Sequence, residues 1–318
     1  MEPRNRNVVI VVVAFVVLLC LCLAVAAVLA LSSFIISDAR TFGPGTSMSA
    51  EESRTIPVEP GASLAVDNFA GSVTVRAGGE GQFQVRAVRR AATSASRNRI
   101  QVQFQETAGG LHIRTVRPAG VLNARVDLEI QVPPGTPVEV ETGAGNLEVR
   151  GVTEGVRAET GSGNVQAQGL AGDVDLGSGS GSVELRDVVG DVAVETGSGN
   201  VTLRGIDGDL TAHTSSGSIL VEGATGQVRL DTGSGSVEYR GTPAGDCRFE
   251  TGSGSIVLYL PADLDARVDL QTGSGSIDVQ FPVEGETRRG RVQGVIGSGE
   301  EATIRAQTGS GSIDVFQD

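Results

Sequence analysis

Hydrophobic and polar residues alternate along most of this chain, and the alternation follows a fixed repeat. Residues 196–204, TGSGNVTLR, form its clearest unit. The opening Thr or Ser of that unit returns with one 18-residue period from Thr142 to Thr232; the later steps are wider, and the last spans two periods. The positions are Thr142, Thr160, Ser178, Thr196, Thr214, Thr232, Thr251, Thr272 and Thr308. A fixed period of this size is typical of proteins that stack identical structural units.

Each 18-residue unit predicts two short strands and two glycine turns. In residues 196–213, apolar side chains fall at Val201 and Leu203 and again at Leu210 and Ala212. Alternation with a period of two is typical of strands that bury one face, and strands this short need neighbours to be stable. Residues 138–318 therefore predict an all-β, right-handed parallel β-helix, or solenoid, of 18-residue coils. A sandwich or barrel does not require identical turns, and propellers repeat at longer periods.

The section before residue 138 alternates less regularly. Residues 55–137 predict an irregular N-terminal part of the same solenoid, with an Arg-rich surface loop or short cap at residues 89–99. Its strands are expected around Leu64/Val66, Val73/Val75, Phe83/Val85, Val102/Phe104, Leu111/Ile113 and Val126/Leu128/Ile130. Residues 280–303 break the repeat and predict an out-looped or distorted coil. The last strand, residues 313–316, is expected to expose the solenoid end, which favours end-to-end self-association.

Residues 1–54 show neither the alternation nor the repeat. Residues 8–31 are uncharged and apolar, and residues 8–36 predict one transmembrane helix because they exceed the length that spans a bilayer. Arg4 and Arg6 precede this segment, so residues 1–7 are expected in the cytoplasm and the rest of the chain outside. A cleaved signal peptide is the alternative. Residues 37–54 are polar and contain Gly-Pro-Gly, which predicts a flexible tether.

Charge and cysteine content narrow the classes of partner. The net charge is −13 and every basic residue is Arg, which argues against non-specific attraction to nucleic acid or anionic lipid. No CxxC pair occurs, so neither a zinc site nor a disulfide framework is indicated. Cys20 lacks the small residue expected before a lipidated cysteine, and with Cys22 it is interpreted as part of the membrane helix. Cys247 falls at a position that other coils fill with Val, which predicts a core residue.

The repeated turns favour a structural interpretation over a ligand site. A phosphate-binding loop requires a lysine, and the chain has none. Glycine permits positive φ without steric cost, which explains identical turns better. The threonine column beside those turns could suggest ice binding, but we expect the hydroxyls to bond to turn backbone. Calcium-binding β-rolls carry Asp inside the turn, whereas here strand-start acids follow it and are expected to pair with arginines. These acids are Asp173, Asp191 and Asp209, and the arginines are Arg150, Arg186, Arg204 and Arg240.

Enzymes on this fold would need a distinctive cluster of reactive side chains. Close carboxylate pairs can hydrolyse glycosides, and the chain offers Asp173/Asp175, Asp207/Asp209 and Asp263/Asp265. These pairs arise from the repeat itself. His112 and His213 each stand alone and are interpreted as solvated side chains. With no nucleophile, base and orienting group together, no catalytic, cofactor-binding or metal-binding residue is assigned.

Several of these segments also resemble a known family. Leu64–Val66, the segment Gly71-Ser72-Val73-Thr74-Val75, the step Gln131-Val132-Pro133, the repeats at 160–167 and 272–279, and the late segment 297–315 are similar to those of bacterial extracytoplasmic proteins called putative adhesins. That family is a domain of unknown function, and the resemblance covers residues 55–318. It implies a β-solenoid outside a membrane and supplies no catalytic residues.

The resulting functional hypothesis is a non-catalytic module. We expect a single-pass, membrane-anchored solenoid on the extracytoplasmic side that serves adhesion or envelope scaffolding, with a protein or a cell-envelope glycan as partner. Long ladders of identical side chains suit multivalent contact. The alternatives are a carbohydrate-binding or polysaccharide-cleaving enzyme, and a sensory partner of an envelope-stress system.

Overall fold

The described part of the chain is one body of two facing β-sheets. The computed structural model describes residues 49–79, 81–107 and 109–318. Thr46–Asp318 form a compact unit, and every described strand and core residue lies within it. A fragment with these residues therefore contains every described contact that stabilises the sheets. No helix in the described ranges is long and apolar enough to span a membrane; the predicted segments 1–7 and 8–36 lie outside those ranges.

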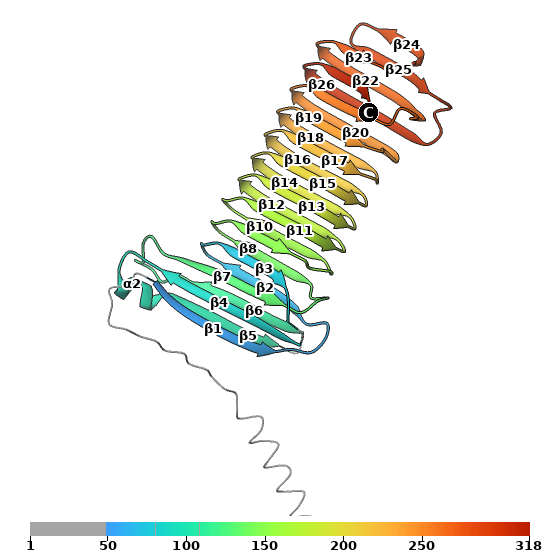
Figure 1. The fold of residues 1–318 in the computed structure, drawn as a ribbon. Helices are drawn as coiled ribbons and strands as arrows, with labels where there is room; N and C mark the ends of the chain where they lie inside the picture. Colours follow the sequence, from blue (N-terminus) through green and yellow to red (C-terminus); the bar gives the residue numbers. More distant parts are fainter. Residues whose placement is uncertain (1–48, 80, 108) are drawn as a thin grey trace, which may run out of the picture. The chain divides into compact units, whose positions relative to one another are not determined.

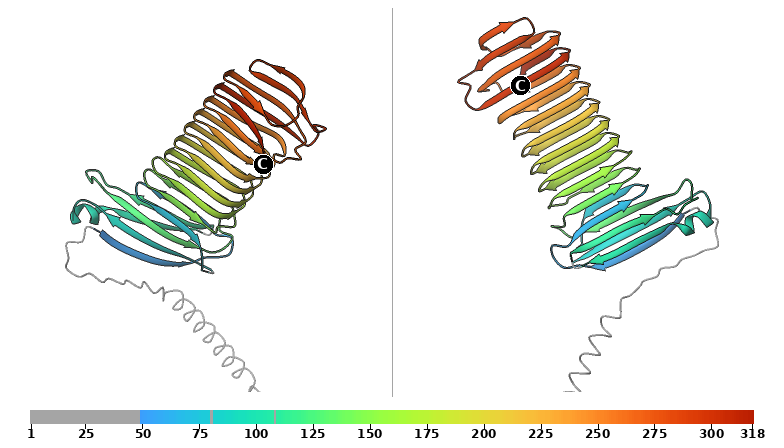
Figure 2. Two further views of the ribbon diagram at one scale, coloured as in Figure 1. Left: turned by 45° about the horizontal axis from the view of Figure 1, so that its top comes forward. Right: turned by 180° about the vertical axis from the view of Figure 1, so that it is seen from behind.

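Between residues 110 and 288, consecutive strands belong to opposite sheets (Figures 1 and 2). Sheet A has 13 strands, in spatial order β1 (Ser49–Pro57), β4 (Gln82–Arg90), β7 (Arg125–Val132), β3 (Val73–Ala77), β9 (Leu147–Arg150), β11 (Val165–Ala171), β13 (Val183–Val189), β15 (Val201–Asp207), β17 (Ile219–Ala224), β19 (Val237–Gly241), β21 (Ile256–Leu260), β27 (Ile313–Gln317) and β23 (Ile277–Val279). Sheet B has 14 strands, in order β24 (Glu284–Arg288), β25 (Arg291–Ile296), β22 (Ala266–Ser274), β26 (Ala302–Ser310), β20 (Gly245–Ser253), β18 (Val228–Ser234), β16 (Leu210–Ser216), β14 (Val192–Ser198), β12 (Val174–Ser180), β10 (Val156–Thr160), β8 (Val138–Thr142), β2 (Ser63–Asn68), β6 (Gly110–Val116) and β5 (Gln101–Thr107).

One coil consists of a strand from each sheet and the turn on either side. Parallel pairing joins Thr196 to Thr214 in sheet B and Val201 to Ile219 in sheet A, so each strand lies beside its equivalent in the next 18-residue coil. The coil is one residue longer between β18 and β20, where Thr232 pairs with Thr251. The coil length predicted from the sequence is therefore confirmed.

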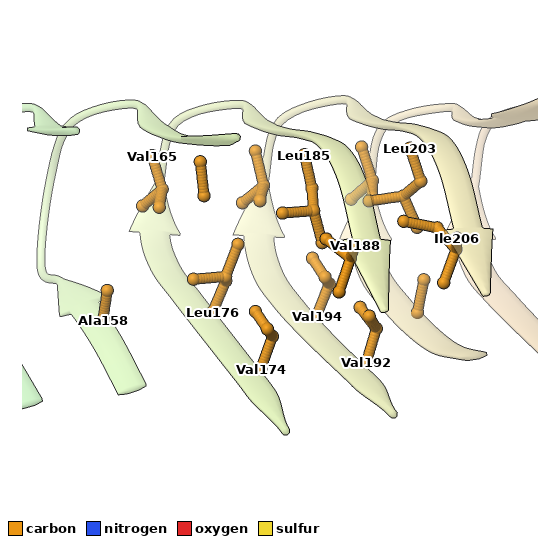
Figure 3. Packing of buried hydrophobic residues seen from close by; sticks show 14 of the residues in the cluster. Ala158, Val165, Val174, Leu176, Leu185, Val188, Val192, Val194, Leu203 and Ile206 are labelled. Carbon is orange, nitrogen blue, oxygen red and sulfur yellow. The ribbon is translucent and has the colours of Figure 1, made fainter. Parts of the chain in front are cut away.

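The core lies between the two sheets and is almost purely aliphatic. Side chains from alternate positions of both sheets point toward one another in successive layers (Figure 3). Val201, Leu203, Leu210 and Ala212 are at most 1% exposed, as their alternation predicts. Each coil alone buries little apolar surface, so stability comes from stacking one coil on the next.

The C-terminal end departs from chain order. Strands β22 and β23 form the outermost coil, the hairpin β24–β25 pairs antiparallel with β22, and the last coil, β26–β27, returns to lie inside them. Ile313 of β27 consequently pairs with Ile256 on one side and Ile277 on the other. The expectation that residues 313–316 expose the solenoid end is wrong, because a repeat pattern does not encode the order of equivalent coils. Residues 280–303 leave the coil as predicted and supply the hairpin.

The N-terminal end shows the same inversion. The coil β2–β3 lies between the coil β6–β7 and the coil β8–β9. The predicted strands all exist, and residues 89–99 contain the short helix α2 (Ser94–Arg99). Residues 49–54, assigned to the tether from sequence, instead begin β1, which pairs antiparallel with β4. This edge strand buries only Ile56, so it shows no apolar alternation.

Candidate interaction surface

The repeated threonines fasten each coil to the turn of a neighbouring coil. The Thr196 hydroxyl donates to the Gly181 carbonyl at 2.9 Å, and the Thr214 hydroxyl donates to the Gly199 carbonyl at 3.1 Å. Both side chains are at most 1% exposed. A buried carbonyl needs such a donor, so the column is structural, as expected, and presents no hydroxyl face to a ligand.

The second glycine of each Thr-Gly-Ser-Gly turn is required by close packing of the coils. Gly199 has φ +155°, and a Cβ on it would lie 2.1 Å from the Gly181 carbonyl oxygen. A Cβ on the first glycine, Gly197, would lie 2.6 Å from the Gly179 carbonyl oxygen, but Ser215 fills the equivalent position on the neighbouring strand β16. The lack of space for a Cβ at the second position explains why this glycine recurs in the turns, without a phosphate ligand.

Polar side chains at the turns bond to the next coil. Asn200 accepts the Ser218 N–H through Oδ1 at 3.0 Å on one edge of the body. On the other edge, Asp191 accepts the Asp209 N–H at 3.0 Å, and Asp209 accepts the Gln227 N–H at 2.9 Å. Within the described ranges, no three His, Cys, Asp or Glu side chains gather in a metal-binding arrangement.

The arginines predicted to pair with these aspartates do not meet them. Arg150 contacts Glu148 at 2.8 Å, and Arg240 contacts Asp318 at 2.6 Å. The same outward face of sheet A carries the pairs Arg186–Glu184 and Arg204–Glu222. The predicted pairing is wrong because the strand-start aspartates precede sheet B strands, whereas these arginines belong to sheet A.

The three candidate acid pairs are engaged separately rather than as dyads. Asp175 pairs with Arg157 at 3.0 Å, and Asp207 accepts the Thr225 hydroxyl at 3.0 Å. Asp265 accepts the Ser298 hydroxyl at 2.6 Å. That hydroxyl, followed by the backbone N–H groups of Glu300 and Ser298, lowers the pKa of Asp265 to about 2.

The histidines and the cysteine lie in unrelated places. His112 contacts Asp67 at 3.0 Å, and His213 contacts Asp231 at 3.3 Å; both imidazoles are partly exposed on sheet B. Cys247 is fully buried, as predicted, and burial raises the pKa of its thiol. A thiol of this kind is a poor nucleophile.

The outward face of sheet B carries a column of eight register positions, six of which are carboxylates. The residue before each repeated Thr occupies one register position, and the column reads Asp67, Glu141, Glu159, Gly177, Glu195, His213, Asp231 and Glu250 from β2 to β20. Glu141 and Glu195 form no ion pair with any described residue. This column was not predicted from the sequence, although the fixed period places all of its members at one register position.

Two open hollows follow this face. One, of about 900 Å³, is lined by the column residues Glu141, Glu159 and Glu195 together with Gly177. The other, of about 720 Å³, adjoins it at Asp175 and runs along the strand starts. Small outward residues leave room beside the acids. We call this surface the sheet B trough. Its carboxylates can accept hydrogen bonds from hydroxyl or ammonium groups.

An aromatic stack on sheet A was not predicted. The rings of Tyr259 and Phe316 stack with centroids 5.3 Å apart, and the Arg240 guanidinium lies 4.4 Å from the Tyr259 ring. Tyr259 and Phe316 are far apart in sequence, but they face each other across β21 and β27. Only the inserted last coil brings them together, so no sequence pattern marks the pair.

Two facing sheets of mainly parallel strands, formed coil by coil and joined by hydrogen bonds between the turns, define an all-β protein of the solenoid class. The chain belongs to the Toastrack DUF4097 family, whose model matches residues 62–316. This confirms the family resemblance inferred from the sequence.

Two solved structures are among those that match the chain. A putative cell adhesion protein from Clostridium sporogenes is 14% identical; the match covers 85% of this chain and 100% of that chain, with a TM-score of 0.24. A putative adhesin from Bacteroides fragilis is also 14% identical; the match covers 86% of this chain and 100% of that one, with a TM-score of 0.37. No curated protein matches the chain.

Proposed function

We propose that this protein is a membrane-anchored, extracytoplasmic solenoid that acts as a non-catalytic adhesion or envelope-scaffolding module. Residues 8–36 would span the membrane, residues 37–48 would tether the body, and the coils would wind in a right-handed sense. The single observation that carries the interaction role is the sheet B trough, where carboxylates recur at the spacing of the coils.

The trough favours an extended, repetitive ligand. Adjacent strands of a sheet lie about 4.8 Å apart, so successive carboxylates form a row rather than a pocket around one reacting bond. A polyhydroxylated glycan can donate hydrogen bonds to several of them at once, and linked weak contacts add to a high avidity. A cell-envelope glycan is therefore the partner we favour over a protein.

Hydrolysis of such a glycan is the second candidate function. It would require an acid and a base placed on either side of one glycosidic bond. The candidate acids instead bond to arginines, hydroxyls and turn backbone, which favours binding over cleavage. A sensory role would need contact through residues 1–36 and has no observation of its own.

Retention of the fragment Thr46–Asp318 on a panel of cell-envelope polysaccharides tests this proposal. We expect binding without release of shortened products. The double variant Glu141→Gln and Glu195→Gln should weaken retention at least ~25-fold, because each lost charge-assisted hydrogen bond contributes about 1 kcal/mol or more, which is about fivefold. Glu238→Gln, on an exposed position of sheet A, is the charge-matched control for either single variant, Glu141→Gln or Glu195→Gln.

Three results would contradict the proposal. Shortened products would show an enzyme and direct attention to Asp175 and Asp207. Equal weakening by the sheet A control would show that net charge, not the trough, governs binding. Retention on none of the glycans would overturn the glycan assignment and turn the search to protein partners.

A further inference from the structure

The charges of this acidic protein are strongly segregated along the chain. Residues 138–318 contain 28 acidic residues and 12 arginines, whereas residues 89–125 contain seven arginines and one glutamate. The net charge of −13 therefore describes the coils and not the N-terminal end of the body. Local charge, more than net charge, decides what a surface attracts within a Debye length of about 10 Å.

The fold gathers several of these arginines at one corner. β4 ends and β7 begins there, with Arg90 opposite Arg125 in antiparallel register. Helix α2 lies beside them and contributes Arg97 and Arg99 (Figures 1 and 2). Arg99 donates to the Ala119 carbonyl at 3.0 Å, which ties the helix to the loop that precedes β7. We call this surface the basic corner.

Few carboxylates balance these guanidinium groups. Arg90 and Arg125 share one acid, Asp127, at 2.9 Å and 3.8 Å. Arg99 forms no ion pair with a described residue, and neither does Arg117, whose guanidinium lies 5.6 Å from the Phe69 ring. Arg99 and Arg117 therefore add positive charge to the corner that no described carboxylate pairs with.

An exposed leucine sits in the same loop. Leu122 is 73% exposed between buried Val121 and Asn123, whose φ of +50° turns the chain. Asn123 lines a hollow of about 680 Å³ together with Arg90 and Arg125. Among the described residues, Val189 is the other large apolar side chain that is strongly exposed, at 62%, and it belongs to the acidic coils.

We infer that the basic corner docks on a bilayer surface rich in anionic phospholipid. Guanidinium groups bind phosphate in bidentate geometry, each basic residue near such a surface adds attraction, and an exposed leucine can enter the headgroup region. This combination of arginines around one apolar tip fits a membrane surface better than a soluble anion.

The position of the corner supports this occupant. The described chain begins at Ser49, which pairs with Arg90 and whose carbonyl accepts from Arg97 at 3.1 Å. The proposed membrane span ends at residue 36, and the segment 37–48 reaches at most ~40 Å when extended. The corner is thus the part of the body where the tether arrives. The acidic coils would be repelled by the same surface, so they would project away from it.

Flotation of the fragment Thr46–Asp318 with lipid vesicles tests the inference without the membrane span. We expect the fragment to float with vesicles of phosphatidylcholine plus phosphatidylglycerol, not with phosphatidylcholine alone, and to be released by high salt. The variant with Arg99→Glu and Arg125→Glu should bind at least ~25-fold more weakly, at about fivefold for each arginine lost. Arg229→Glu, on an exposed position of sheet B, is the charge-matched control for either single variant, Arg99→Glu or Arg125→Glu, each of which should weaken binding about fivefold.

A second pair of variants tests Leu122, the exposed apolar residue of the basic corner. Leu122→Ser should reduce binding several-fold, because the leucine no longer enters the headgroup region, whereas Val189→Ser should leave binding unchanged. Equal flotation with both vesicle types, or equal loss in the Arg229→Glu control, would overturn the inference. The biological setting rests on the proposed membrane anchor, but failure of the anchor would appear separately, as release of the full chain from membranes by salt washing.

Discussion

Replacing Gly199 by alanine tests how closely the coils approach each other. The new Cβ would lie 2.1 Å from the Gly181 carbonyl oxygen and 2.5 Å from the Gly181 carbonyl carbon, where ordinary contacts begin near 3.4 Å. The same carbonyl accepts the Thr196 hydroxyl at 2.9 Å, and the Gly181 N–H donates to the Ser198 carbonyl at 2.9 Å across the same two turns. The two turns would have to separate by roughly 1 Å, which strains both bonds.

The cost follows from strain and lost hydrogen bonds. An alanine forced to hold a φ of +155° costs about 1–3 kcal/mol. Two weakened hydrogen bonds at this partly buried turn add about 1 kcal/mol each. The free energy of unfolding should therefore fall by roughly 3–5 kcal/mol. For a body of this size, each kcal/mol lowers Tm by about 2–4 °C, so we expect a loss of roughly 6–20 °C.

Thermal unfolding of the fragment Thr46–Asp318, followed by circular dichroism, measures this effect. Gly197→Ala is the matched control, because Ser215 shows that a side chain is accepted at that position. We expect the control to lose at most about one third as much. If the two variants have the same Tm, or if Gly199→Ala has the Tm of the wild type, the coils do not pack as closely at this turn as described.

Three further substitutions test the core, the threonine column and the C-terminal loop. Val201→Asp places an unpaired charge in a fully buried position; it should cost more than about 4 kcal/mol and abolish the native strand signal in circular dichroism, whereas the outward Thr202→Asp should keep it. Thr214→Val removes the donor to the Gly199 carbonyl and should cost about 1–2 kcal/mol in denaturant unfolding, with Thr211→Val, on the exposed face, unchanged. Asp265→Asn should lower Tm at neutral pH. Because the folded pKa of Asp265, about 2, lies below its ordinary 3.8, the stabilisation is present above pH 4 and is lost as the pH falls toward 2. A Tm difference between wild type and this variant that persists unchanged to pH 2 would contradict the assignment.

The repeat period predicted most of the fold. The positions of Val201, Leu203, Leu210 and Ala212 in the core, the coil length and the structural role of the threonines all follow from one repeated unit. Cys247 was placed in the core by the same comparison between coils. These predictions succeed because every coil packs against its neighbours in the same way, so equivalent positions in different coils have the same surroundings.

The features that the sequence did not predict depend on the spatial order of the coils and on which sheet each strand joins. The insertion of β26–β27 inside β22–β23 leaves the repeat pattern unchanged, and it alone creates the Tyr259–Phe316 stack. Edge strand β1 has only one buried side chain, so no alternation marks it. The arginines of sheet A were assigned to the wrong acids because spacing along the chain does not say which sheet a strand joins. The net charge of the whole chain is negative, so it does not indicate the local positive charge at the basic corner.

The interaction role depends on whether the sheet B trough binds one repetitive ligand along several coils. The most direct measurement is the affinity of the fragment Thr46–Asp318 for envelope glycan oligomers of increasing length, with the mass of each oligomer checked after binding. Multivalent contact predicts that affinity rises steadily as the oligomer covers more coils and that its mass stays the same. An affinity that stops rising at the shortest oligomer, or an oligomer recovered in shortened form, would contradict the account.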